Sequence, residues 1–327
     1  MANPNFIYPI KFSPILKDKI WGGEKLNKQL GKKTSSTRVG ESWEISDVGQ
    51  DVSVVSNGHL KGKTLRELIE IYKSEFIGTE NFESFGYKFP LLIKFIDAQQ
   101  DLSIQVHPND ELSQKRHNSF GKTEMWYVIQ NEKYSKLVLG FNKEITSKDY
   151  LKYLENKDIM SVLKVENIKK GDTFFIETGT VHAIGAGSLI AEIQQTSDIT
   201  YRIYDFDRRD DQGNERELHT ELAIDAINFD ADLKTKCDYT ENTNKLNKLV
   251  YCDYFKTNLI PVVGELKLDY SANDSFVIFM CVEGISEIIV SGNSETISTG
   301  ETILIPASNN FVEIKSSSDC KLLEVTV

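Results

Sequence analysis

The stretch Leu102-Ser-Ile-Gln-Val-His-Pro-Asn-Asp110 decides how the rest of the sequence is interpreted. Apolar and polar residues alternate in it, which is typical of a β-strand whose alternate side chains point to one face. Ser103, Gln105 and His107 would then share a face. An amide oxygen and an imidazole nitrogen two residues apart on a stiff strand can point at one metal ion. A half-exposed edge strand gives the same pattern, so the stretch alone leaves both interpretations open.

Length, composition and charge describe an ordinary globular protein. The chain has 327 residues, of which 40% are hydrophobic and 27% charged, and it is long enough for two domains or one large one. The net charge of −11 and the absence of a dense basic run argue against a nucleic-acid or anionic-membrane partner. A small anionic substrate stays compatible with this charge, because it needs only a local cluster of cations.

The sequence also bears on where the protein works. The first residues contain no apolar run of signal-peptide length, and no stretch approaches the length needed to cross a bilayer. The cysteines form no close pairs in the sequence, and they are Cys237, Cys252, Cys281 and Cys320. A disulfide framework or a cysteine zinc site is therefore disfavoured, and we expect a cytoplasmic protein.

Helical segments are expected at a few places between runs of short strands. Thr64 is followed by Glu67 in a capping-box pattern, and Thr146 is followed three residues later by Asp149 in the same way. Helices are predicted over 64–78 and 218–229, and one helix or a pair of helices over 146–162, whereas 109–122 is interpreted as a polar loop.

Two strand predictions carry charged residues of interest. The run 40–46 alternates, which would place Glu41, Trp43 and Ile45 on one face. The apolar run 90–98 is interrupted by Lys94, whose burial costs free energy unless its ammonium finds a partner or water. Lys94 could reach the rim of the fold, or it could sit in a cavity that requires a positive charge.

The last third of the chain has a different character. A polar segment over 230–248 is interpreted as a linker. Beyond it, short β-type runs are separated by glycines, which favours a sandwich or barrel. We therefore divide the chain into a domain over 1–237, which would carry the site, and a β-barrel over 238–327.

The stretch from Gly171 to His182 resembles the second sequence motif of cupins. Gly171, Gly179 and His182 match the motif, whereas Glu177 stands where the proline usually does. Four motifs then follow one another in the chain, Ser-Ile-Gln-Val-His-Pro (103–108), Gly-Lys-Thr-Glu (121–124), Gly-Thr-Val-His-Ala (179–183) and Tyr-Arg-Ile-Tyr-Asp-Phe (201–206). Together they resemble the type I mannose-6-phosphate isomerases, in their short form, over about residues 5 to 230.

The resemblance implies a fold and a reaction. The fold would be mainly β, with tandem cupin (jelly-roll β-barrel) domains and a few helices inserted in or flanking the N-terminal part. The reaction would interconvert mannose 6-phosphate and fructose 6-phosphate by metal-assisted proton transfer between C1 and C2, through an enediol.

The resemblance also implies a metal site. It makes Gln105, His107, Glu124 and His182 the ligands of one zinc ion per chain, and two nitrogens with two oxygens form a set that zinc accepts. In the alternative interpretation, both histidines are satisfied core groups and Glu124 is a solvated strand end. The remaining histidines lack such a context and are expected at the surface; they are His59, His117 and His219.

Other positions match residues of the family's cavity. Arg202, Glu192 and Lys122 are the predicted catalytic residues, and Arg202 would stabilise the enediolate or orient the sugar. The predicted substrate-binding residues are Ser103, Lys94, Trp21, Glu41, Asp198 and Arg208. Lys122 also matches a position near the phosphate end, with Ser103 and Lys94.

Simpler interpretations exist for several of these residues. Glu192 and Asp198 are candidates for proton relay, but either could instead pair with Arg202 or a lysine. Trp21 could pack against its own domain, and Arg208 could belong to a charged turn.

The C-terminal part repeats the cupin motif over 300–311 without its ligands. Ser308 replaces the second glycine and Phe311 stands in place of the histidine, and a phenyl ring cannot bind a metal. The second barrel is therefore expected to be structural.

Two other classes of protein compete with this interpretation. One is a non-catalytic sugar-binding cupin that kept the pocket, against which the intact Arg202, Glu192 and Lys122 count. The other is a metal-dependent cupin oxygenase, whose iron usually takes a more histidine-rich set. A phosphosugar is the expected small-molecule partner, and the chain is expected to be a monomer or a weak homodimer.

Overall fold

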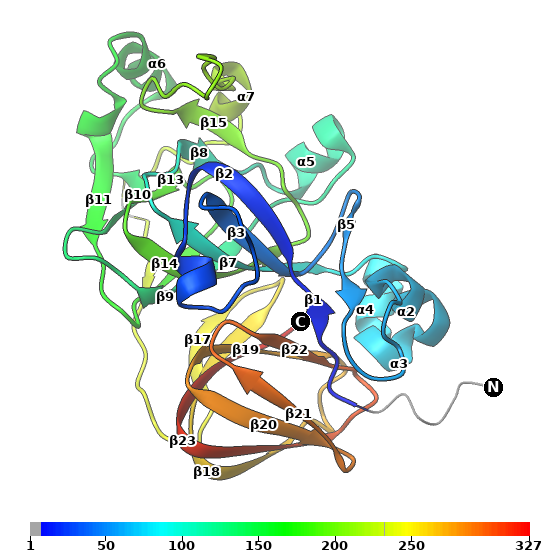
Figure 1. The fold of residues 1–327 in the computed structure, drawn as a ribbon. Helices are drawn as coiled ribbons and strands as arrows, with labels where there is room; N and C mark the ends of the chain where they lie inside the picture. The colour runs from blue at the N-terminus through cyan, green and yellow to red at the C-terminus, as the bar shows by residue number, and fades with distance from the viewer. Residues whose placement is uncertain (1–7, 232) are drawn as a thin grey trace.

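The computed structural model describes residues 8–231 and 233–327, and these form a mainly β protein (Figure 1). An N-terminal part, coloured blue to green, lies above a C-terminal barrel coloured yellow to red. The expected fold class, with few helices placed in and around the N-terminal part, is confirmed.

Two sheets face each other in the N-terminal part. Its strands are β1 (Phe12–Ser13), β2 (Ile15–Gly23), β3 (Val39–Ile45), β4 (Asp47–Val48), β5 (Asp51–Val52), β6 (Val54–Val55), β7 (Leu91–Ala98), β8 (Ile104–Val106), β9 (Glu124–Gln130), β10 (Lys136–Phe141), β11 (Leu163–Asn167), β12 (Thr173–Ile176), β13 (His182–Ile184), β14 (Ser188–Gln195), β15 (Tyr201–Tyr204) and β16 (Lys236–Cys237). The larger sheet has the order β16-β12-β9-β14-β7-β3-β2, and the smaller one has the order β11-β10-β13-β8-β15.

The helices lie outside these sheets. They are α1 (Lys25–Lys28), α2 (Leu65–Tyr72), α3 (Ser74–Ile77), α4 (Thr79–Phe85), α5 (Asp110–His117), α6 (Ser147–Glu155) and α7 (Thr220–Ile224), with a 3₁₀ turn η1 (Ile159–Val162). Both predicted capping boxes are present, at Thr64 before α2 and at Thr146 before α6. The helix predicted over 218–229 is real but shorter, since α7 ends at Ile224.

The segment 109–122 was predicted to be a polar loop, and this prediction was wrong over Asp110–His117, which form the helix α5. Only Ser113 of this helix is buried, so its sequence lacks the periodic apolar residues that would predict a helix. The Asn109 side chain accepts a hydrogen bond from Leu112 N at 2.9 Å, which caps the helix. Acids in its first turn and bases in its last turn complement the helix dipole.

The C-terminal part forms a barrel from strands of 4 to 16 residues. They are β17 (Asn247–Tyr251), β18 (Lys256–Asp269), β19 (Val277–Glu283), β20 (Ile285–Val290), β21 (Asn293–Ser298), β22 (Thr302–Ile305) and β23 (Phe311–Thr326). The sheet order is β17-β18-β23-β19-β22, and β20 joins β21 to β23. The segment 230–248 is not wholly irregular, since β16 pairs with β12 and β17 begins at Asn247. Phe311 begins β23 with 66% of its surface exposed.

The two parts share a hydrophobic core. One cluster of buried side chains includes Ile93 and Met125 of the larger N-terminal sheet together with Leu259 and Ile278 of the barrel. The Phe89 and Phe276 rings meet across the boundary, with centroids 4.7 Å apart. Within the described residues, no helix has both the length and the apolar character that a membrane crossing requires.

Candidate active site

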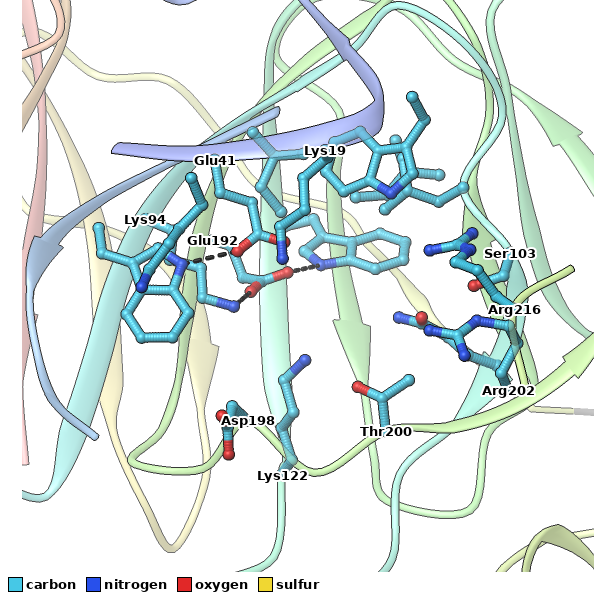
Figure 2. Close-up of a pocket in the computed structure, with 18 of the residues that line it drawn as sticks. Lys19, Glu41, Lys94, Ser103, Lys122, Glu192, Asp198, Thr200, Arg202 and Arg216 are labelled. Atoms are coloured by element: carbon cyan, nitrogen blue, oxygen red, sulfur yellow. Dashed lines mark hydrogen bonds and ion pairs between the residues drawn. The ribbon is translucent and has the colours of Figure 1, made fainter. Parts of the chain in front are cut away.

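A cavity of about 410 Å³ opens between the two N-terminal sheets (Figure 2). Residues of β2, β3, β7, β9 and β14 line one side, and residues of β8, β13 and β15 line the other. The predicted site residues found in this lining are Trp21, Glu41, Lys94, Ser103, Gln105, Lys122, Glu192, Asp198 and Arg202. The structure therefore gathers residues separated by up to 181 positions in the sequence, from Trp21 to Arg202, around one cavity.

Three predicted metal ligands form a buried cluster. Ligand atoms of His107, Glu124 and His182 all lie within 4.8 Å of one another. Glu124 stands between the imidazoles, with Oε2 3.5 Å from His107 Nε2 and Oε1 3.4 Å from His182 Nε2. The side chains are at most 1% exposed.

Strand pairing places these side chains. His182 at the start of β13 is the register partner of Gln105 in β8, and Gln105 also pairs with Arg202 in β15. Glu124 begins β9 in the opposite sheet. His107 directly follows β8, and Gly179 N donates to its carbonyl oxygen at 3.0 Å. Short strands and tight turns thus bring three distant segments to one point.

Hydrogen bonds at the outer ring nitrogens orient both imidazoles. His107 Nδ1 lies 2.9 Å from the Ile199 carbonyl oxygen, and His182 Nδ1 lies 2.8 Å from the Thr180 carbonyl oxygen. A carbonyl only accepts, so each Nδ1 carries the proton and each Nε2 presents a lone pair to the cluster.

Burial keeps both imidazoles neutral. It lowers the pKa of His182 to about 4, and it lowers the pKa of His107 well below the ordinary value, with the nearby Lys122 acting in the same direction. Neutral imidazole is the form that binds metals.

Glu124 is an unsatisfied buried carboxylate. Neither of its oxygens accepts a well-aligned hydrogen bond, although Lys122 Nζ lies 3.2 Å from Oε2. Burial raises the pKa of Glu124 to about 7 against the lowering effect of Lys122. An orphaned carboxylate between two inward-facing lone pairs fits a divalent cation, whose charge would supply the missing partner.

Gln105 lies beside this cluster. Its amide nitrogen is 3.3 Å from His182 Nε2. Because amide oxygen and nitrogen exchange places by a half-turn of the side chain, the carbonyl oxygen can take the same position and serve as a ligand.

Lys122 connects the cluster to the cavity. Its ammonium lies 3.1 Å from His107 Nε2 as well as near Glu124, and its side chain is 6% exposed. In Figure 2 it rises from below toward the middle of the cavity. It is therefore a proton-bearing group of the cavity that lies in direct contact with the cluster.

A second group of charges lies on the β2, β3 and β7 side. Lys19 Nζ is 3.1 Å from Glu41 Oε1, and Trp43 Nε1 donates to Glu41 Oε2 at 2.6 Å. Burial alone would raise the pKa of Glu41, but Lys94, Lys19 and the Trp43 N–H outweigh it and lower that pKa to about 2. Glu41 is thus held as a carboxylate.

Lys94 lies in the cavity and not at the rim of the fold, and it is buried and paired with a carboxylate. Its Nζ lies 2.9 Å from Glu192 Oε1, and Trp126 Nε1 donates to Glu192 Oε2 at 2.9 Å (Figure 2). Burial opposes both charges, but the pairing prevails, so the pKa of Lys94 is raised and that of Glu192 is lowered. Both oxygens of Glu192 are occupied.

Two arginines stand at the opposite side of the cavity, close to Ser103 (Figure 2). Arg202 Nη1 donates to the Glu217 carbonyl oxygen at 2.8 Å, while its buried Nε has no partner. Arg216 binds Asp205 through two nitrogens, at 2.7 and 2.5 Å. Burial and the charge of Arg216 lower the pKa of Arg202, so this side favours an anion.

Arg208 and His219 differ in position from the sequence-based expectation. Arg208 is not among the cavity-lining residues and donates to the Asp101 carbonyl oxygen at 2.5 Å, with Asp205 3.6 Å away. His219 was expected at the surface but is half-buried, and its Nδ1 accepts from Arg202 N at 3.0 Å. It therefore holds the backbone that carries Arg202.

Sequence reasoning missed several lining residues. Lys17 and Lys19 alternate with Trp21 along β2, so the strand pattern could have placed all three on one face. Arg216 lies in a loop without a motif, and only the tertiary fold brings it to the cavity.

These features define a class of protein: a double cupin with a buried His/Glu/His cluster beside a cationic cavity. Residues 10–144 match the family "Phosphomannose isomerase type I, catalytic domain", and residues 245–327 match "Mannose-6-phosphate isomerase, cupin domain".

Whole-chain relatives agree with these matches. The chain is 36% identical to Mannose-6-phosphate isomerase ManA of Bacillus subtilis (95% of this chain, 97% of the relative) and 34% identical to a mannose-6-phosphate isomerase of Streptococcus mutans (94% and 93%). Its fold matches the crystal structure of a mannose 6-phosphate isomerase from Bacillus subtilis with a TM-score of 0.88 and 32% identity, over 98% of this chain and 100% of that one. The chain belongs to the type I phosphomannose isomerase family, as the sequence motifs predicted.

Proposed function

We propose that this chain interconverts mannose 6-phosphate and fructose 6-phosphate. The observation that carries the proposal is a buried glutamate between two neutral imidazoles, next to a cavity that is lined by arginines and lysines and that Lys122 connects to this cluster. The first feature suits a metal-held sugar oxygen, and the second suits a phosphate group.

We propose one zinc ion per chain, held by His107, Glu124, His182 and the carbonyl oxygen of Gln105. The neutral imidazoles, the orphaned carboxylate and the adjacent amide support this donor set, which zinc accepts readily. Bound zinc would act as a Lewis acid toward the C1 and C2 oxygens of the sugar.

The reaction moves one hydrogen between neighbouring carbons. A base takes the C2 proton of the open-chain aldose while the C1 oxygen gains a proton, which gives the enediol. The C2 hydroxyl then loses its proton and C1 gains one, which gives the ketose. Such steps need a group that holds a proton near C1 and C2 and a positive charge that stabilises the developing oxyanion.

We assign these tasks to three residues of the cavity. Lys122 would hold and move the proton, because its ammonium lies between the cluster and the cavity. Arg202 would stabilise the oxyanion through its unpartnered Nε–H. Glu192 would keep Lys94 in place and charged, since both of its oxygens are occupied.

Further residues in and beside the cavity would bind the sugar phosphate. Ser103 and Arg216 lie near Arg202 and would meet the phosphate, and Arg208 would support them through Asp205. The residues assigned to the sugar and to the field around it are Trp21, Glu41, Lys94 and Asp198.

Three further proposals concern the whole chain. A domain boundary at 237/238 is supported by strand pairing, because β16 joins the N-terminal sheet while β17 joins the barrel. A cytoplasmic location is supported by the four free cysteines, which a reducing compartment preserves. A monomer or weak homodimer remains our proposal for the assembly, to be measured by light scattering.

The experiment that tests the function is a coupled assay of fructose 6-phosphate formation from mannose 6-phosphate, before chelation, after chelation and after zinc is restored. Activity that disappears with the chelator and returns with zinc supports both the reaction and the metal. A folded, zinc-loaded sample without turnover would overturn the proposed reaction.

A further inference from the structure

The turn between β17 and β18 of the C-terminal barrel reaches the N-terminal part. Tyr254 lies in this turn, and its hydroxyl donates to Asp110 Oδ2 at 2.7 Å. Asp110 is the first residue of α5, three positions beyond the candidate ligand His107. This bond therefore joins the barrel to the surroundings of the active site.

The other carboxylate oxygen of Asp110 faces a different segment. Asp110 Oδ1 accepts from Gly121 N at 2.7 Å and from Gln195 Nε2 at 3.0 Å. One carboxylate thus connects the barrel, the start of α5, the Gly121 backbone and the end of β14.

Gln195 holds the same segment from its other side. Its side-chain oxygen accepts from Thr123 N at 2.8 Å, and its backbone N donates to the Thr123 carbonyl oxygen at 3.1 Å. The backbone from Gly121 to Thr123 is therefore fixed at both ends by the pair Asp110 and Gln195.

The fixed backbone carries Lys122 and leads into Glu124. It is also pressed against α5, because a Cβ added to Gly121 would lie 2.7 Å from Asp110 N. Since Lys122 Nζ contacts His107 Nε2 at 3.1 Å and Glu124 Oε2 at 3.2 Å, a small movement of this backbone would displace the ammonium from both. Displacements on the order of 1 Å are enough to cost an enzyme large factors in rate.

We propose that Tyr254 is a positioning residue of the active site. Through Asp110, the C-terminal barrel fixes the segment 121–124 and so sets the place of the Lys122 ammonium. The barrel, which holds no member of the His/Glu/His cluster, thereby takes part in the arrangement of the site. The kinetic consequence rests on the proposed isomerase function, whereas the structural consequence does not.

The test uses two tyrosine variants of the full chain. Tyr254→Phe removes the hydroxyl that reaches Asp110, and Tyr251→Phe removes the hydroxyl that donates to Asn258 Oδ1 at 3.0 Å within the same hairpin. Each loses one hydrogen bond, so similar small losses of thermal stability are expected. We expect kcat to fall about three- to tenfold for Tyr254→Phe with KM nearly unchanged, and to stay at the wild-type value for Tyr251→Phe.

Amide hydrogen exchange provides a readout that needs no turnover. Exchange at residues 121–124 should accelerate in Tyr254→Phe and not in Tyr251→Phe. Equal exchange and equal kcat in the two variants would overturn the proposal. If the wild-type chain had no isomerase activity, the proposed function would fail while the exchange data still decided the positioning role.

Variants of Asp110 separate positioning from general stability. Asp110→Asn keeps an oxygen for Gly121 N and an amide for the Tyr254 hydroxyl, so it should restore most of the turnover that Asp110→Ala loses. Tyr254→Phe should have no further effect on kcat in the Asp110→Ala background. Additive effects of the two substitutions would show that Tyr254 does not act through Asp110.

Discussion

At the scale of single residues, the site depends on which nitrogen of each imidazole carries the proton. The Nδ1–H groups of His107 and His182 donate to the Ile199 and Thr180 carbonyl oxygens, so both Nε2 lone pairs face Glu124. Apart from the Lys122 ammonium, 3.2 Å from Oε2, the buried carboxylate then faces lone pairs and accepts no well-aligned hydrogen bond, which is unfavourable. The fold thus pays in stability for a preformed place for a positive ion.

His182→Ala tests the metal assignment directly. Loss of one of the few donors should reduce bound zinc at least about tenfold and abolish turnover. Even the loss of a group that only hydrogen-bonds to a metal ligand typically lowers metal affinity by this factor. Metal analysis after gel filtration measures the zinc, and circular dichroism checks the fold. His59→Ala is the control, because His59 is exposed and outside the cavity. A full equivalent of zinc in His182→Ala would refute the ligand assignment.

Arg202→Ala separates charge stabilisation from metal binding. Turnover should fall about a hundred- to a thousandfold, as for other lost oxyanion donors, while zinc content stays at one equivalent. Arg209→Ala is the control, because Arg209 is exposed and its side chain binds Gly213 and Glu215 of its own turn. An unchanged rate in Arg202→Ala would remove this arginine from the mechanism.

Glu41 gives a prediction about pH. Its pKa of about 2 in the folded chain lies below the ordinary 4.5, so its charge stabilises the fold above pH 4.5, and this contribution is lost as the pH falls toward 2. Glu41→Gln should lower the free energy of unfolding at pH 7 by up to about 3 kcal/mol. Urea unfolding of both metal-free proteins should show a smaller difference at pH 3.5. A difference that does not change with pH would contradict the assignment.

At the scale of elements, a glycine turn joins β12 to β13 and places His182. Gly179 has φ +88°, and a Cβ there would lie 2.9 Å from the Ala226 carbonyl oxygen. Gly213 has nearly the same φ of +86° with nothing within 4 Å. Comparing Gly179 with Gly213 therefore separates the cost of placing a Cβ on a left-handed backbone from the cost of a steric clash with neighbouring atoms.

Alanine substitutions at these two glycines should differ. Gly213→Ala should cost about 1 to 2 kcal/mol, the penalty of a left-handed backbone for a residue with a Cβ. Gly179→Ala should cost more, because Ala226 must also move, and it should weaken zinc binding through His107 and His182. Chemical denaturation and zinc titration measure the two effects. Equal losses of stability and unaltered zinc affinity would contradict this account of the turn.

Elements with local signals could be predicted from the sequence. The capping boxes at Thr64 and Thr146 gave two helices their starts, and the alternation around Gln105 gave the face shared with the cavity. α5 could not be predicted, because a cap and the helix dipole hold it and only Ser113 is buried. Its polar surface gives no periodic pattern.

Features that depend on strand register and on the tertiary fold could not be predicted from the sequence. Glu41, Trp43 and Ile45 were expected on one face. In the register of β3 with β7, Trp43 lies opposite Lys94 and Ile45 lies opposite the next residue, Ile93. The extra residue of β3 between them is a bulge, so Ile45 points to the other face. Glu41 and Trp43 therefore line the cavity, while Ile45 enters the core shared with the barrel. His107, Glu124 and His182 could be grouped from the sequence because they sit in motifs, whereas the place of Arg216 at the cavity depends on the tertiary fold.

At the scale of the whole molecule, the two parts behave as one structure because their apolar surfaces face each other. The hydrophobic cluster that contains Phe95 of the larger N-terminal sheet also contains Phe255 and Phe276 of the C-terminal part. The loop between β22 and β23 of the barrel also binds α3, since Ala307 N and Ser308 N donate to the Phe76 and Glu75 carbonyl oxygens at 3.0 and 2.9 Å. Separating the parts would expose a core rather than a polar interface.

Such a shared core predicts that both parts unfold together, and the chain contains separate probes for each. All three tryptophans, Trp21, Trp43 and Trp126, lie in the N-terminal part, so their fluorescence reports on it alone. Cys281 and Cys320 are buried in the barrel, and a thiol reagent reaches them only when the barrel opens. We expect the fluorescence and the labelling of these thiols to give the same midpoint in urea, as one cooperative transition requires. Barrel thiols that react at a lower urea concentration, with tryptophan fluorescence still native, would show that the barrel opens alone and that the shared core does not couple the two parts.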